Sequence, residues 1–242
     1  MKNPFVRILK TLLQPIGLRV NAGPFKGLRC YPTESGDAVI AKVCGTYEME
    51  IFPAVEEIIA RKPQIVADIG AAEGFYVAGF ASRLHESQII AYEAKPEWQE
   101  RIRNLLRLNR LGQSVVIRGF CGKDELQTLA HEVASAERSF VFMDIEGGEW
   151  PLLLEEDFRE WRNTDFLVEL HEPSTRELGT QLARKMEATH HVSMIEAQGR
   201  SLFCVESRLW RFFLGLPGGW TSRLNEGRNH QMRWLFAKSN SQ

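Results

Sequence analysis

Hydrophobic positions along the chain alternate between short continuous runs and longer stretches with helical spacing. The short runs predict buried strands at 65–67, 88–93, 114–118, 139–145 and 166–171. Helical spacing predicts helices at 48–61, from residue 75, and at 96–111, 123–136, 149–162 and 174–189. Strands that alternate with helices are typical of a parallel sheet covered on both faces. Two later strand-like runs, 191–197 and 232–237, lack a helix between them, which indicates a hairpin with an aromatic insertion at about 199–229.

The residues before this pattern predict a separate extension. Apolar positions from 5 to 16 have helical spacing with Lys and Arg elsewhere, which predicts a basic amphipathic helix. Such a helix packs on its own domain or, alternatively, lies on a membrane surface or on a partner subunit. Short alternating pieces at 28–31 and 39–43 predict small antiparallel strands. We therefore predict a helix and β extension at 1–47, followed by one α/β domain at 48–242.

Composition narrows the class of protein. The chain has 242 residues and is 44% hydrophobic, enough for the sizeable core of one α/β domain. A net charge of -1 gives no field that would attract nucleic acid. The four cysteines form no CxxC pair, which favours reduced thiols over zinc ligation or disulfides. No apolar run reaches the ~20 residues of a membrane span, and no secretion signal is recognisable, so we expect a cytoplasmic protein.

The stretch from residue 65 to 76 predicts a cofactor-binding corner. A buried strand ends near Asp68, a tight turn contains Gly70 and Gly74, and a helix follows. Glycine allows a sharp turn and a close approach to a ligand. Open α/β sheets bind cofactors at such strand-turn-helix corners. The other interpretation is a glycine-rich turn of the kind found in any α/β protein.

Three predicted strands end in acids, namely Asp68, Glu93 and Asp144. The carboxyl ends of neighbouring parallel strands lie together, so we expect these acids to share one crevice. Asp68 and Glu93 are 25 residues apart, close to the spacing of about 20 between a glycine turn and a ribose-binding acid. This spacing points to a cofactor that contains adenosine.

The turn itself favours one such cofactor. A nicotinamide or flavin site has the pattern GxGxxG with a pyrophosphate at the helix start, whereas this turn is D-I-G-A-A-E-G. Glu73 at the helix start would repel a pyrophosphate. S-adenosylmethionine carries a sulfonium and an ammonium group and no phosphate, so an acidic turn suits it better. A nucleotide-dependent oxidoreductase is the less favoured alternative.

These motifs resemble those of class I S-adenosylmethionine-dependent methyltransferases, and more narrowly the FkbM family. The blocks that carry the resemblance are ADIGAAEGFY at 67–76, AYEAKP at 91–96, MDIEGGEW at 143–150 and VELH at 168–171. The third block looks like the family pattern D-[VI]-E-G-x-E, and the likeness covers about residues 46–197. Two departures are Glu73, where the family often has Asn, and Ala94, where it commonly has Pro.

The resemblance implies a doubly wound, Rossmann-like sheet of seven strands, mostly parallel, in which the C-terminal hairpin places one strand antiparallel. It also implies O-methylation of a hydroxyl on a sugar, a lipid-linked glycan or a secondary metabolite. A homodimer is one arrangement that the aromatic insertion would allow. We expect the cofactor to be bound by Asp68, Gly70, Ala71, Gly74, Tyr76, Glu93, Phe120, Cys121 and Asp144. For Phe120 and Cys121, loop packing is an equal alternative, and for Tyr76 a place in the core.

Methyl transfer to a hydroxyl needs a base to take the proton. His171 ends the fifth strand beside the expected crevice, and the pKa of a free histidine suits the task. Asp144 and Glu146 are the other expected catalytic residues. The same region also fits a divalent metal site built from Asp144, Glu169 and His171, with Glu146 nearby, that lowers the pKa of the hydroxyl.

Three alternatives stay open at this point. Glu146 and Glu149 also fit a purely structural role in capping the helix that follows them, and His171 also fits a structural role. The aromatic insertion suits either a lid over the substrate or a dimer contact. A non-catalytic cofactor-binding or scaffold module is the alternative to an enzyme, and the presence of all three acids together with His171 speaks against it.

Overall fold

The architecture comes from a computed structural model that describes residues 17–31, 36–172, 177–198, 204–206 and 232–240. The described residues form a seven-stranded sheet in the order β5-β4-β3-β6-β7-β9-β8. Its strands are β3 (Ile65–Ile69), β4 (Gln88–Tyr92), β5 (Val115–Arg118), β6 (Ser139–Met143), β7 (Thr164–Leu170), β8 (His190–Glu196) and β9 (Arg233–Ser239). Strands β3 to β7 pair in parallel, and β9 pairs antiparallel with both β7 and β8. This confirms the predicted sheet and its C-terminal hairpin.

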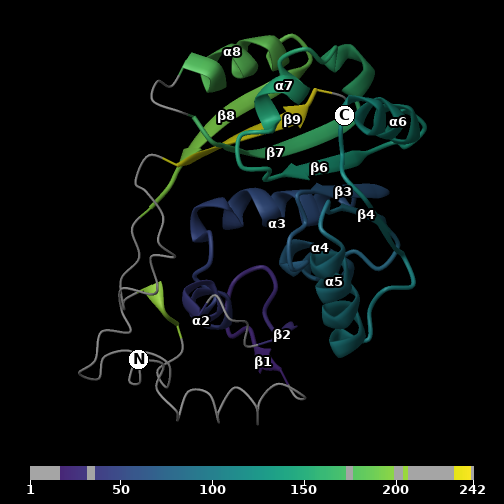
Figure 1. The fold of residues 1–242 in the computed structure, drawn as a ribbon. Helices are drawn as coiled ribbons and strands as arrows, with labels where there is room; N and C mark the ends of the chain where they lie inside the picture. Colours follow the sequence, from purple (N-terminus) through teal and green to yellow (C-terminus); the bar gives the residue numbers. More distant parts are fainter. Residues whose placement is uncertain (1–16, 32–35, 173–176, 199–203, 207–231, 241–242) are drawn as a thin grey trace.

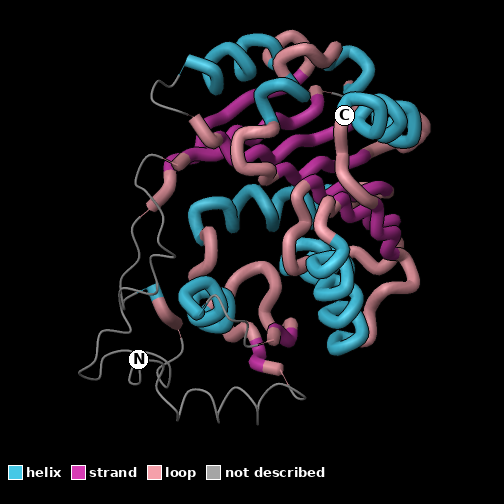
Figure 2. Tube along the Cα trace, in the orientation of Figure 1, coloured by secondary structure: helices cyan, strands magenta, loops and turns pink. Residues whose placement is uncertain are grey.

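Helices cover both faces of the sheet, as Figures 1 and 2 show. One face carries α3 (Phe52–Arg61), α4 (Phe75–Arg83) and α5 (Pro96–Asn109), and the other carries α6 (Lys123–Ala134), α7 (Glu149–Leu153) and α8 (Glu177–Met186). Successive side chains of a strand point to opposite faces. Accordingly Val66 of β3 packs in the core beneath α3, α4 and α5, while Ala67 packs in the core beneath α6, α7 and α8.

The order of the strands places a switch point between β3 and β6. The chain runs from β3 outward through β4 to β5, then returns to β6 on the other side of β3. In open α/β sheets, ligands bind beyond the carboxyl ends of the strands at such a point. The backbone N–H of Asp144, just after β6, donates to the carbonyl of Ile69 at the end of β3 (3.0 Å). The corner at Gly70 and the acid at Asp144 therefore meet at the switch point.

Helix α2 (Gly36–Cys44) shows that the strand predicted at 39–43 was wrong. Val39, Ile40, Val43 and Cys44 are all buried. Val39 and Val43 are four residues apart, as are Ile40 and Cys44, and residues at this spacing lie on the same face of a helix. The run therefore also fits a helix. Strands β1 (Leu18–Arg19) and β2 (Arg29–Cys30) form the small antiparallel pair, of which β2 falls within the expected 28–31. The predicted helix at 5–16 lies outside the described residues.

Two other boundaries differ from the sequence prediction. The helix expected at 149–162 is broken into α7 and the 3₁₀ helix η2 (Phe158–Trp161). Asp157 has extended backbone angles, and its carboxylate accepts from the N–H of Arg159, which starts the second helix anew. Helix α5, expected to reach residue 111, ends at Asn109 with Arg110 as its left-handed cap. The 3₁₀ helix η1 (Met49–Ile51) precedes α3, within the helix expected at 48–61.

Most of the aromatic insertion expected at about 199–229 lies outside the described residues, and so does 174–176 of the helix expected at 174–189. The remaining helices and strands fall close to their predicted ranges. None of the helices in the described ranges combines the length and the apolar character that crossing a bilayer requires.

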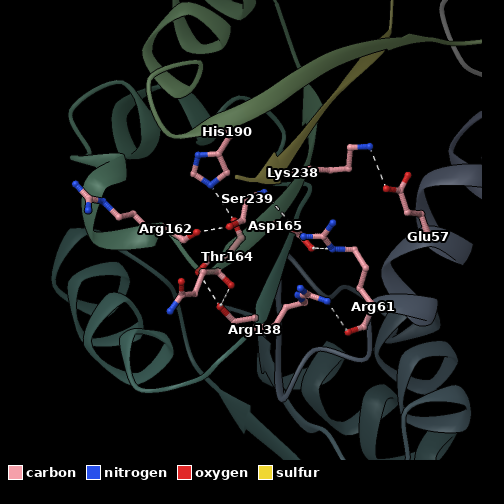
Figure 3. Close-up of polar contacts among 11 residues, drawn as sticks. Glu57, Arg61, Arg138, Arg162, Thr164, Asp165, His190, Lys238 and Ser239 are labelled. Carbon is pink, nitrogen blue, oxygen red and sulfur yellow. Dashed lines mark hydrogen bonds and ion pairs between the residues drawn. The ribbon is translucent and has the colours of Figure 1, made fainter. Parts of the chain in front are cut away.

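A polar network at the amino end of β7 fastens the C-terminal hairpin to the sheet (Figure 3). The buried Asp165 accepts from the backbone N–H of Ser239 in β9 (2.8 Å) and pairs with Arg61 of α3 (2.9 Å). His190 of β8 bonds the carbonyl of Thr164 through Nε2 (2.8 Å). These contacts fix one end of β7, and His171 follows directly on its other end.

Candidate active site

The turn after β3 requires glycine at position 70. The backbone N–H groups of Gly70 and Ala71 both donate to the carbonyl of Tyr92 (3.0 Å each), which holds the turn against β4. Gly70 has a φ of +91°, and a Cβ there would lie 1.9 Å from the carbonyl oxygen of Asp144. Any side chain would therefore push β3 and the turn after β6 apart. Gly74 also has positive φ, +85°, and begins α4.

Asp68 is buried at this corner, and no ion pair joins it to a cation among the described residues. Its side chain is 2% exposed, and its Oδ2 has no hydrogen-bond partner among the described residues. Burial raises the pKa of Asp68 well above its usual value, and the charges of Asp144, Glu48 and Glu93 raise it further. The carboxylates at the strand ends thus lie close enough to act on one another. A buried carboxylate in this setting is stabilised by a cationic ligand.

Glu93, after β4, is held in place by backbone groups. Its Oε2 accepts from the N–H of Ala72 and its Oε1 from the N–H of Lys95, both at 2.9 Å. Each carboxylate oxygen keeps a further lone pair for another donor. The Gln99 side chain of α5 donates to the Glu93 carbonyl (2.8 Å) and ties this loop to the helix. Glu93 is therefore oriented beside the turn after β3 with acceptor capacity left.

His171 follows β7 and lies among carboxylates. Its Nε2 lies 3.7 Å from Oδ1 of Asp144, 3.5 Å from Oε2 of Glu146 and 3.9 Å from Oε2 of Glu169. This Nε2 and Oδ1 of Asp144 are buried atoms without a hydrogen-bond partner among the described residues. Burial alone would lower the pKa of His171, but the hydrogen bond and charge of Glu149, with the charges of Asp144 and Glu146, raise it. On balance the pKa of His171 is raised above that of a free histidine, so the protonated ring persists to higher pH.

Burial also raises the pKa of Asp144, to about 6. The charge of Glu48 adds to this effect, while a hydrogen bond with Glu169 and the charge of His171 oppose it. Glu169 is 2% exposed, whereas the side chain of Glu146 is 88% exposed. Asp144 therefore acts on both parts of the site: its charge raises the pKa of Asp68, and its Oδ1 lies 3.7 Å from Nε2 of His171.

Glu149 makes contacts that the sequence did not indicate. Its side chain is fully buried, and its Oε1 accepts from the backbone N–H of His171 (2.8 Å) while its Oε2 accepts from that of Gly147 (2.9 Å). The same Oε1 lies 3.3 Å from Nδ1 of His171. Trp150 donates from its indole to the His171 carbonyl (2.9 Å). The turn after β6 therefore clamps the end of β7, which goes beyond a cap on α7.

Glu48 is a further buried acid that sequence reasoning missed. It is 1% exposed, precedes η1, and has a left-handed backbone with φ +51°. The hydroxyl of Tyr76 donates to its Oε2. Tyr76 itself is buried, and its ring stacks on Phe142 of β6 at 4.2 Å between centroids. In the sequence, Glu48 is distinguished by nothing but its place at the start of a predicted helix.

The other residues expected to bind the cofactor differ in their burial. Ala71 and Cys121 are buried, and burial raises the pKa of the Cys121 thiol to about 12, so the thiol stays protonated. Phe120 is 71% exposed, just after β5. Glu73 forms an ion pair with Lys42. Lys42 therefore compensates its charge, which weakens the repulsion of a pyrophosphate that we expected from Glu73 alone.

The residues suggested for a metal do converge. Within the described part of the chain, Asp144, Glu169 and His171 each offer one ligand atom, and these atoms lie within 4.8 Å of one another. Carboxylate oxygens and an imidazole nitrogen are ligands that Mn²⁺, Fe²⁺ and Zn²⁺ accept. The donor set therefore fits a divalent cation, although exposed and buried acids also gather without one.

Comparisons with known proteins bear on the fold. No family model matches the chain, and no curated protein matches its sequence. Among solved structures, a candidate O-methyltransferase from Klebsiella pneumoniae has a TM-score of 0.50 at 13% identity, over 84% of this chain and 88% of that one. The precorrin-6y C5,15-methyltransferase of Geobacter metallireducens has a TM-score of 0.48 at 14% identity, over 79% and 87%. The first likeness shows that the chain has the Rossmann-like fold found among methyltransferases.

Proposed function

We propose that this chain is an S-adenosylmethionine-dependent O-methyltransferase of the FkbM type. Its acceptor would be a hydroxyl group of a sugar, a glycan or another small metabolite. The observation that carries the proposal is the placement of two acids at the Gly70 turn of the sheet's switch point: Asp68, which is buried, and Asp144, whose side chain is 30% exposed. Fold alone would not carry it, because one fold hosts many functions.

The residues at the corner fit the proposed cofactor. Oδ2 of Asp68, which has no hydrogen-bond partner among the described residues, is an acceptor suited to an ammonium group. Glu93 is oriented to accept from the two hydroxyls of a ribose. Phe120, exposed after β5, supplies an aromatic surface for an adenine. S-adenosylmethionine would supply a methyl group on a sulfonium, an electrophile with an excellent leaving group.

The chain's own part in the reaction is then to position and deprotonate the acceptor. A hydroxyl is a weak nucleophile near pH 7, so a base that takes its proton as the bond forms speeds the reaction. With Nδ1 directed at Glu149, the neutral His171 carries its proton there and leaves Nε2 as the acceptor. Asp144 and Glu146 flank Nε2 and stabilise the imidazolium that forms.

A metal-assisted version of the same reaction is the second candidate. It is favoured by one observation, the convergence of Asp144, Glu169 and His171 on a common point. A divalent cation held there would lower the pKa of the acceptor hydroxyl directly. In that version His171 is a ligand and no longer the base. Turnover that survives dialysis against a chelator supports the histidine base, and turnover restored only by Mg²⁺ or Mn²⁺ supports the metal.

Calorimetry tests the proposal against its alternatives. We expect S-adenosylmethionine and S-adenosylhomocysteine to bind in the micromolar range, and NAD to give no heat. Binding of NAD without binding of either adenosyl compound would reject the assignment in favour of an oxidoreductase. A chain that binds S-adenosylhomocysteine but transfers no methyl group to any hydroxyl in a panel of sugars and glycans would instead be a cofactor-binding module.

A further inference from the structure

Basic and acidic residues are segregated along the chain. The first acid of the sequence is Glu34, and the residues before it carry the basic side chains of Lys2, Arg7, Lys10, Arg19, Lys26 and Arg29. A second stretch without an acid runs from 101 to 123 and carries Arg101, Arg103, Arg107, Arg110, Arg118 and Lys123. The net charge of -1 for the whole chain conceals this segregation, because the remaining residues are correspondingly acidic.

The fold packs parts of these two basic stretches against each other. The side chain of Asn109 in α5 accepts from the backbone N–H of Arg29 in β2 and donates to the Arg29 carbonyl, both at 2.8 Å. Tyr31, directly after β2, donates from its hydroxyl to the carbonyl of Asn104 in α5 (3.3 Å). The β1–β2 pair and the second half of α5 therefore lie side by side (Figure 1).

Two arginines face each other in the β1–β2 pair. Arg19 and Arg29 are directly opposite in the register, and like charges in that position repel. Arg19 is exposed, Arg29 is half-buried, and Lys26 in the connection between the strands is exposed. None of these three cations has an acid as its ion-pair partner within the part of the chain that the structure describes. The small sheet thus presents positive charge that the protein itself does not compensate.

Helix α5 continues this positive charge. Arg103, Arg107 and Arg110 are spaced by four and three residues, which places them along one side of the helix. Glu100 pairs with Arg103 (3.3 Å) and with Arg107 (2.7 Å), so one acid stands against three arginines. Cations at the end of a helix also suit its dipole. The dipole accounts for Arg107 and Arg110, but it does not account for the opposed arginines of the β1–β2 pair.

The described structure begins at this same surface. A Cβ on Gly17, the first described residue, would lie 2.8 Å from Leu108 of α5 and 3.2 Å from the Cβ of Arg29. The sequence before Gly17 combines apolar positions at helical spacing with basic residues, a pattern typical of segments that lie on anionic membranes. Binding to nucleic acid phosphates needs the basic residues but no apolar stripe. The sequence and the point where the description begins therefore favour a lipid partner.

We propose that the surface formed by Arg19, Lys26 and Arg29 of the β1–β2 pair with Arg107 and Arg110 of α5 docks on a membrane that contains anionic phospholipids. We call it the basic surface. Lys and Arg side chains near an anionic membrane each add to the attraction, and anionic headgroups relieve the repulsion between Arg19 and Arg29. The inference does not depend on the proposed function, because it uses none of the residues of the cofactor corner.

Sedimentation of the full chain with lipid vesicles tests the proposal. The vesicles are made of phosphatidylcholine alone or with a quarter of phosphatidylglycerol, and the bound fraction is measured against lipid concentration. We expect binding to the anionic vesicles only. Binding should weaken as salt rises from about 0.05 M to about 0.5 M, because salt screens the attraction between the arginines and the headgroups.

A double variant locates the binding on the basic surface. Arg19→Gln combined with Arg110→Gln should weaken partitioning onto anionic vesicles roughly 25-fold, about 5-fold for each charge removed. Its affinity for S-adenosylhomocysteine should not change. The matched control combines Lys62→Gln, after α3, with Arg184→Gln in α8, which removes two exposed basic side chains elsewhere. The control should bind the vesicles like the wild type.

Several results would overturn the inference. Equal binding to neutral and anionic vesicles, or binding to neither, would exclude an anionic membrane as the partner. An equal loss in the control would mean that total charge acts and not this surface. Retention on single-stranded RNA without binding to vesicles would assign the surface to nucleic acid. If the double variant does not fold, Lys26→Gln replaces it and should weaken binding roughly 5-fold, and an unchanged value there would contradict the proposal.

Discussion

The carboxylate of Glu149 bonds the backbone of His171 and lies beside its ring. Its Oε1 accepts from the His171 N–H at 2.8 Å and lies 3.3 Å from Nδ1 of the imidazole. Glu149 and His171 are 22 residues apart in sequence and sit after neighbouring strands, β6 and β7. We expect this proximity to favour the tautomer with the proton on Nδ1, which leaves Nε2 on the side of Asp144 and Glu146.

Glu149→Gln should lower kcat while leaving cofactor affinity unchanged, because Glu149 positions His171 without lining the adenosyl site. We expect a fall of about 10-fold to 100-fold, by analogy with substitutions of residues that orient a functional histidine. The pH profile separates this role from a merely structural one. Since the hydrogen bond and charge of Glu149 raise the pKa of His171, the acid limb of the kcat profile should move to lower pH in the variant. An unmoved profile would contradict the assignment.

His171→Asn removes the proposed base and should reduce turnover by roughly 10²-fold to 10⁴-fold. The affinity for S-adenosylhomocysteine should remain within a few-fold of the wild type, because the proposed adenosyl site lies after β3 and β4. Turnover is followed as labelled methyl incorporated into the acceptor. His191→Asn, an exposed histidine of β8, is the control and should be indistinguishable from the wild type. Full activity in His171→Asn would exclude the histidine as the base.

Gly70→Ala should destabilise the protein through steric overlap as well as backbone strain. The new Cβ would lie 1.9 Å from the Asp144 carbonyl oxygen. Gly27→Ala is a matched control, since Gly27 has a similar φ of +96° with nothing within 4 Å of a Cβ. Both variants share the left-handed strain of roughly 1–2 kcal/mol, so the difference in their unfolding free energies in urea isolates the overlap. Equal destabilisation of the two variants would contradict this prediction, because it would mean that the Gly70 turn moves away from the new Cβ without a cost in free energy.

We expect His190 to lower the stability of the folded protein in mild acid. Its neutral ring bonds Thr164 and Thr189, and burial lowers its pKa despite opposing contributions that include the charge of Asp165. Below pH of about 6.5 the unfolded chain takes up a proton that the folded chain does not, so stability falls with pH until the folded pKa is reached. Urea unfolding from pH 8 to 5 should therefore show a steeper decline for the wild type than for His190→Gln. Parallel curves would contradict this account.

The sequence was sufficient for the sheet and for the acids that end its strands. Buried parallel strands are continuous apolar runs, and Asp68, Glu93 and Asp144 directly follow or end such runs, so the topology alone brings them to one edge. The prediction of a strand at 39–43 was wrong because the apolar spacing there fits both a strand and a helix. Tertiary packing selected the helix α2.

The contacts of Glu48 and Glu149 could not be predicted in the same way. Each depends on where a side chain from a turn is directed after distant segments have packed, and neither follows a periodic pattern. Glu149 was expected to favour the start of α7, yet its carboxylate bonds backbone N–H groups of Gly147 and His171. The ion pair between Glu73 and Lys42 is a further case, because α2 was not expected to be a helix beside the cofactor turn.

A crystal structure of the protein with S-adenosylhomocysteine tests the central claim most directly. The account predicts the ribose hydroxyls on Glu93, and the amino group of the ligand within hydrogen-bond distance of Asp68 and Asp144. A ligand bound away from the Gly70 turn, with these carboxylates left unengaged, would contradict it.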